Sequence, residues 1–121
     1  MIELGGLGVM GVGLSSAELV AVDPASFGAV GDVLRLVFGG PLDASAELGS
    51  TAVSFATAPG ISCSSRAVRC TVAGDTLTVE AVRSFSIRRD LGSESVAGIA
   101  NLTDADGQSA VVPTPIMIST N

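Results

Sequence analysis

The chain has 121 residues, which suits one domain, and 47% of them are hydrophobic, which excludes a disordered chain. Its formal charge of −6 repels phosphate backbones, and the densest basic stretch, Arg83–Arg89, is too thin for a nucleic-acid site. We therefore expect no nucleic acid among its partners. The aliphatic composition, with four Phe and no Trp or Tyr, favours strands over helices.

The chain begins with a Gly-rich apolar segment, MIELGGLGVMGVGL, over Met1–Leu14. No Lys or Arg precedes the apolar run, so it does not fit a signal peptide, and it is too short to span a bilayer. We expect a chain that is made in the cytoplasm, stays soluble and has no membrane partner. An apolar arm packs on its own domain or on a neighbour. The side chains predicted to dock are Met1, Ile2, Leu4, Leu7, Val9, Met10, Val12 and Leu14.

After an arm of residues 1–17, short alternating runs separated by turn residues predict one β-domain over residues 18–121. In Val33–Phe38, alternation places Leu34, Leu36 and Phe38 on one face, and Gly39-Gly40-Pro41 ends the run. One helical turn is compatible with Asp43–Leu48. The further predicted strands are Glu18–Val22, Thr51–Ala58, Ser84–Ile87, Val96–Leu102, Ala110–Val112 and Ile116–Ser119.

The clearest local signal is a hairpin over Val68–Ala81. Val68, Cys70 and Val72 alternate with polar residues before Gly74-Asp75, and a second alternating run follows. Gly tolerates the positive φ of a primed two-residue turn. Seven to nine short strands at regular spacing predict an all-β antiparallel sandwich with an Ig-like arrangement.

The segment Val33–Ser45, VLRLVFGGPLDAS, resembles the strand and F-x-x-P-L-D signature of bacterial Ig-like domains. Ile99–Ala110, IANLTDADGQSA, is similar to the Asp-x-x-Gly-polar turn before the last strand of that family. The resemblance extends over roughly residues 18–119 and implies an Ig-like sandwich. It says little about function, because one fold serves many functions.

Gly6, Gly8 and Gly11 form a G-x-G-x-x-G pattern like that of dinucleotide-binding loops. Such a loop needs a preceding strand, a following helix and an acidic residue about twenty positions later. Here only four residues precede the glycine run, and no strand–helix–strand unit follows. We expect no nucleotide cofactor.

Cys63 and Cys70 are the only cysteines, and the chain has no His, so thiolates and imidazoles cannot complete a zinc site. Their spacing fits either a small disulfide loop or two reduced thiols, one of them in the core. The residues alone leave both states open. Asp104 and Asp106 begin like a calcium loop, but the later ligands are missing, which favours a plain turn.

The chain has no His, Lys or Tyr, and its carboxylates form no convincing pair, so we expect no catalysis, cofactor or metal. The leading hypothesis is a structural virion protein, made in the host cytoplasm, that decorates a phage capsid or tail. Its partners are capsid or tail subunits and its own copies, and removing Met1–Leu14 is expected to abolish assembly but not folding. The first alternative is an extracellular adhesin domain, which predicts a disulfide. A carbohydrate-binding module ranks last, because sugar sites favour exposed Trp or Tyr.

Overall fold

The computed structural model describes residues 11–21, 27–45, 48–57, 60–83 and 94–120. These residues form eight strands and no helix, so the predicted all-β class is confirmed. No described segment forms a helix that is long and apolar enough to cross a membrane. The strands are β1 (Leu14–Val20), β2 (Val33–Phe38), β3 (Ala52–Phe55), β4 (Ile61–Ser62), β5 (Val68–Ala73), β6 (Thr76–Ala81), β7 (Ser95–Ala100) and β8 (Ile116–Thr120).

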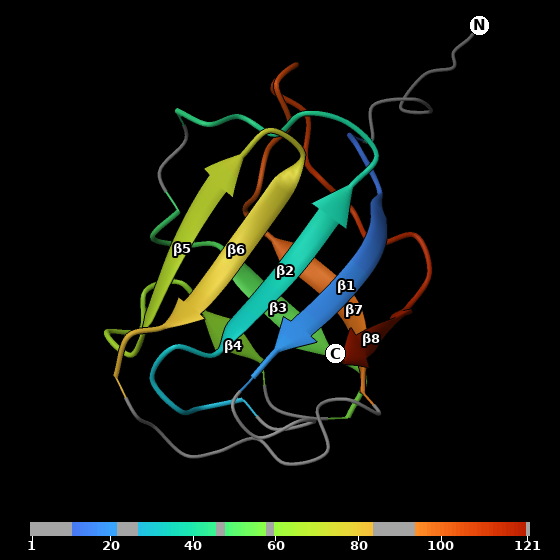
Figure 1. Ribbon diagram of the computed structural model, residues 1–121. Helices are drawn as coiled ribbons and strands as arrows, with labels where there is room; N and C mark the ends of the chain where they lie inside the picture. The colour runs from blue at the N-terminus through green and yellow to red at the C-terminus, as the bar shows by residue number, and fades with distance from the viewer. Residues whose placement is uncertain (1–10, 22–26, 46–47, 58–59, 84–93, 121) are drawn as a thin grey trace, which may run out of the picture.

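The eight strands belong to one hydrogen-bonded sheet in the order β4-β3-β7-β8-β1-β2-β6-β5. All neighbours are antiparallel except β1 and β8, which pair in parallel through Ala17–Leu19 and 118–120. Strand β8 also pairs with β7, so it joins the two halves of the sheet. The sheet curls, and β3, β4 and β7 cross behind β1, β2, β5 and β6 (Figure 1).

The core lies between these two halves of the sheet. In β2, Leu34, Leu36 and Phe38 are buried while Arg35 is exposed, which is the predicted alternation. Strand β6 adds a matching row, since Leu77 pairs with Leu36 across the ladder. Buried residues from β3, β7 and β8 belong to the same cluster, including Val53, Phe55, Val96 and Ile118. One aliphatic core with few aromatics therefore holds both halves together.

The predicted hairpin is present. Strands β5 and β6 pair from Val68 with Ala81 to Ala73 with Thr76, leaving Gly74 and Asp75 as the turn. Gly74 has a φ of 61°, and a Gly at the first turn position with positive φ is the signature of a type II′ turn.

Three expected elements differ from the structure. Strand β1 begins at Leu14, four residues before the predicted start of the domain, and irregular pairing between Leu14 and Ser16 interrupts its alternation. Residues 110–112 form only an isolated bridge, through Val111, and Asp43–Ser45 is not helical. The strand expected at 84–87 lies outside the described residues. Strand β4 has two residues and follows Pro59-Gly60. It is too short to show the alternation that would have predicted it.

Candidate docking site

The root of the arm, Gly11-Val12-Gly13, is bonded to its own domain. Gly11 N donates to Ser109 O at 2.8 Å, and Val111 N donates to Val12 O at 3.0 Å. On the other side, Gly39 N donates to Gly13 O at 2.9 Å. The root therefore lies between the 39–41 segment and the 104–111 loop. It is separated from that loop by about a hundred residues in sequence. Any segment before Gly11 starts from this fixed point.

Glycine is required in the root because the backbones approach closely. A Cβ on Gly11 would lie 2.5 Å from Ser109 O and 2.7 Å from Asp104 Oδ2. On the opposite side, a Cβ on Gly40 would lie 2.9 Å from Val12 Cγ1. These contacts explain Gly11 and Gly40 by packing rather than by ligand binding.

Asp104 holds the root and the loop together. Its Oδ2 accepts from Val12 N at 3.2 Å, and its Oδ1 accepts from Asp106 N at 2.9 Å and Gln108 N at 3.0 Å. The carboxylate is 4% exposed, so these N–H groups replace water as its partners. Its oxygens stabilise a turn, as the sequence predicted. Within the described residues, no three Cys, Asp or Glu side chains gather as metal ligands.

The structure places the two last predicted docking residues on the domain itself. Leu14 is the first residue of β1 and is 5% exposed, so it belongs to the core rather than to a surface that a partner reaches. Val12 is half-buried and packs against the core. Because deleting Met1–Leu14 would also remove the core residue Leu14, a deletion that isolates the arm should end at residue 10. Met1, Ile2, Leu4, Leu7, Val9 and Met10 lie outside the described residues.

The helix that a dinucleotide-binding loop requires does not follow the glycine pattern in the described residues. Gly6 and Gly8 lie outside the described residues, and Gly11 packs against the 104–109 loop. Leu14–Val20, where the helix would begin, is strand β1. A helix N-terminus is what holds a pyrophosphate in such a motif, so the described part of the pattern cannot provide that site.

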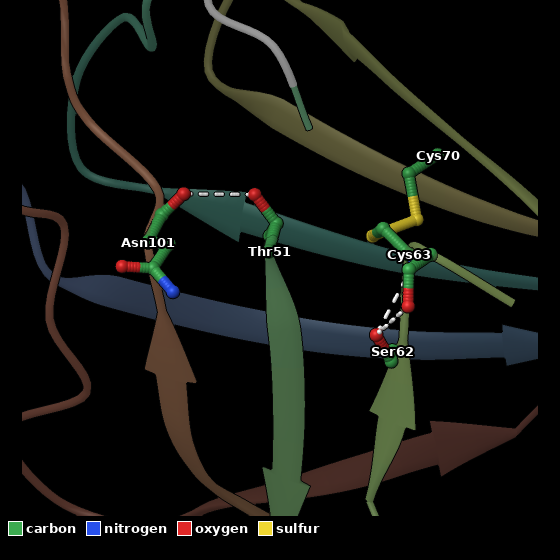
Figure 2. Close-up of a disulfide and its surroundings, with 6 residues drawn as sticks. Thr51, Ser62, Cys63, Cys70 and Asn101 are labelled. Atoms are coloured by element: carbon green, nitrogen blue, oxygen red, sulfur yellow. Dashed lines mark hydrogen bonds between the residues drawn. A yellow bond between two sulfur atoms is a disulfide. The ribbon is translucent and has the colours of Figure 1, made fainter. Parts of the chain in front are cut away.

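The structure joins Cys63 and Cys70 in a disulfide, with their Cα atoms 5.7 Å apart (Figure 2). Cys63 directly follows β4 and Cys70 lies in β5, and these are the first and last strands of the sheet. Among the described strands, no ladder pairs β4 with β5. The hydrogen-bonded turn over residues 62–68 connects these two strands, and the disulfide adds a covalent link across this side of the curled sheet. We call this side the seam.

Hydrogen bonds connect the seam to the far side of β3. Cys63 N donates to Thr51 O at 2.8 Å. Thr51 Oγ1 in turn donates to Asn101 O at 2.8 Å, a bond that Figure 2 shows. Asn101 has a φ of 57° at the end of β7 and donates from its amide to Ser50 O. This left-handed conformation turns the chain after β7, and Asn tolerates it better than most residues. The network has a structural role.

The other buried carboxylates, Asp32 and Glu94, also accept hydrogen bonds from nearby loop residues. Asp32 is 2% exposed, and its Oδ2 accepts from Gly28 N at 3.0 Å and Ala29 N at 2.9 Å. Glu94 Oε1 accepts from Thr57 N at 3.0 Å, and its other oxygen accepts from the Thr57 hydroxyl. Each acid organises a loop on a different part of the fold. They form no acid–base pair among the described residues.

Comparison with protein-family models, curated proteins and solved structures finds no match to this chain.

Proposed function

We propose that this protein is a non-enzymatic structural domain that docks onto protein partners through residues 1–10. The observation that carries the proposal is the rigid root. Five hydrogen bonds hold residues 11–14 to distant segments: Gly11 to Ser109, Val12 to Asp104, Val111 to Val12, Leu14 to Val111 and Gly39 to Gly13. A short apolar arm that starts from a fixed point loses less freedom on binding than one on a loose linker.

The preferred setting is a particle surface, where the domain is a virion component that decorates a capsid or tail. Repeated copies on a symmetric surface strengthen individually weak arm contacts. The Ig-like resemblance of the β2 region supports this setting, since such domains occur on phage particles. In this role the arm binds capsid or tail subunits, or a sister copy.

A bacterial surface adhesin is the second candidate, because that role predicted a disulfide, which is equally compatible with a particle surface. Structural disulfides persist in oxidising surroundings such as cell and virion surfaces, and are rare in the cytoplasm. The Cys63–Cys70 bond adds a covalent link across the seam, so the folded domain benefits from such surroundings.

A carbohydrate-binding role has less support. Phe27, Phe38 and Phe55 are 0%, 2% and 7% exposed, so none offers a stacking platform, and Phe85 lies outside the described residues. In the part of the chain that the structure describes, no group of side chains is suited to sugar stacking or to acid–base catalysis.

The test compares the oxidised full chain with a chain of residues 11–121, using light scattering after gel filtration over a range of concentrations. We expect the full chain to assemble and the shortened chain to be monomeric with nearly the same melting temperature. A full-length variant with Leu7→Ser and Val9→Ser is the matched control for chain length, and it should also be monomeric. If the shortened chain assembles normally, or the full chain never assembles, the docking role is wrong.

A further inference from the structure

Apart from the Arg35–Glu18 pair on the outer face of β1 and β2, the exposed charges of the described residues gather toward the two ends of the β5–β6 hairpin. Asp75 lies in the turn that joins the two strands, and Arg66 and Arg83 flank their other ends. The two strands have six residues each, which separates the ends by roughly 20 Å. In Figure 1 the turn is at the top, and the opposite ends of the strands are at the lower left.

The turn end is acidic. Leu42 N donates to Gly74 O, and Leu42 forms a bridge with Asp104, so the loops that carry Asp43 and Asp106 lie beside the turn. Asp75 and Asp106 are exposed. No described Arg lies in these segments. The root of the arm is anchored at this same end, through Asp104.

The opposite end is basic at its surface. Arg66 lies within the disulfide loop, and Arg83 N donates to Ala67 O at 3.2 Å, which brings the two arginines to the same side of the seam. Arg69 is also exposed but lies 4.0 Å from Glu80. Ala81 N donates to Asp32 O, which places Asp32 nearby, but its carboxylate is buried against two backbone N–H groups. Three of the four described arginines therefore gather here around one half-exposed acid, Glu80, in a chain whose net charge is −6.

We propose that the partner of the arm is a second copy of this chain, bound head to tail. The acidic end and its arm, residues 1–10, meet the basic end of the next copy around Arg66 and Arg83. This inference rests on the docking role proposed above and names its partner and surface. A head-to-tail contact joins two different patches, so it builds a chain or a ring rather than a closed dimer.

The apolar contacts of the arm and the contacts between opposite charges contribute differently to association. Apolar side chains of the arm provide most of the affinity, whereas complementary charge steers the encounter and selects the correct end. A second copy is favoured over an anionic polymer because the complementary acidic surface and the arm occur together on this chain. Exposed charges are screened beyond about 8–10 Å at moderate salt. Association should therefore weaken about tenfold between 50 and 500 mM NaCl.

The test uses two full-length, oxidised variants. The first carries Arg66→Glu and Arg83→Glu, which makes both ends acidic, and the second carries Asp75→Arg and Asp106→Arg, which makes both ends basic. Sedimentation velocity should show that each variant alone associates at least tenfold more weakly than the native chain. An equimolar mixture of the two should assemble, because every junction then joins opposite charges.

Single substitutions provide the matched control. Arg83→Glu should weaken self-association about fivefold, while Arg35→Glu, the same charge change on the outer face of β2, should leave it unchanged. Assembly of each double variant alone at native strength, with the 11–121 chain monomeric, would overturn the head-to-tail contact and leave the docking role intact. A mixture that stays monomeric, while the native chain binds dextran sulfate in an Arg83-dependent manner, would assign the basic end to an anionic polymer instead.

Discussion

The arm root and the seam hold segments of the same domain together by different means. At the root, Gly11 and Val12 exchange hydrogen bonds with residues 104–111, almost a hundred positions away in sequence. At the seam, the hydrogen bonds of the 62–68 turn are local, such as Ser65 N to Ser62 O, and the Cys63–Cys70 bond adds a covalent link. The root therefore depends on backbone hydrogen bonds, close packing and one carboxylate, and the seam depends on oxidation.

The largest loss of stability is expected from a substitution in the core, against which both the root and the seam pack. Phe38 is 2% exposed at the end of β2 nearest the root, so Phe38→Ala should lower the free energy of unfolding by about 3–5 kcal/mol. Urea unfolding of the oxidised protein measures this loss. Val37→Ala, on the outer face of the same strand, is the control and should lose about 1 kcal/mol or less. A small loss at Phe38 would mean that the β2 register is wrong.

Breaking the root is expected to have the next largest effect. Asp104→Ala leaves the N–H groups of Val12, Asp106 and Gln108 without their acceptor, which should cost about 2–4 kcal/mol. Asp106→Ala removes an exposed carboxylate from the same loop and should change stability by no more than about 0.5 kcal/mol. Equal losses in the two variants, measured by urea unfolding, would show that Asp104 does not anchor the root.

Opening the seam is expected to have a slightly smaller effect. The disulfide closes a loop of about eight residues, so Cys63→Ser with Cys70→Ser should cost about 2–3 kcal/mol by restoring freedom to the unfolded chain. The same loss should appear when the native protein is unfolded in reductant. Adding Asp104→Ala should give an additive loss if root and seam act independently, and a clearly non-additive total would contradict that separation.

The exposed ion pair on the outer face should have the smallest effect. Arg35 Nη1 lies 3.6 Å from Glu18 Oε1, and both side chains are 47% exposed. Water screens such pairs, so Arg35→Ala should change the free energy of unfolding by no more than about 0.5 kcal/mol. A thermal melt checks this value. A loss similar to that of Asp104→Ala would mean that this face is covered by a partner or by another part of the chain.

The sequence predicted the parts of the fold that depend on near neighbours. Val33–Phe38 alternates without interruption, and Gly74 marks the hairpin turn, so both elements follow from local pattern. The start of β1 was missed because the register shift between Leu14 and Ser16 disturbs its alternation. The two-residue β4 was missed because it has almost no pattern to read.

The arm root could not be predicted because its cause is distant in sequence. Gly11 is needed where its backbone meets Ser109 and Asp104, and no local pattern reveals that contact. Asp104 looked like an ordinary turn residue, and the turn was predicted correctly. Its bond to Val12 was not, because it joins positions 92 apart. The same holds for the seam, since the sheet order that makes β4 and β5 its ends is a long-range property.

The docking role requires a root that stays fixed whatever happens at the seam. Hydrogen exchange of the full chain, measured before and after reduction of the disulfide, tests this requirement directly. We predict that residues 61–70 lose protection on reduction while the amides of Gly11, Leu14 and Val111 keep theirs. Simultaneous loss of protection at both places would contradict the account.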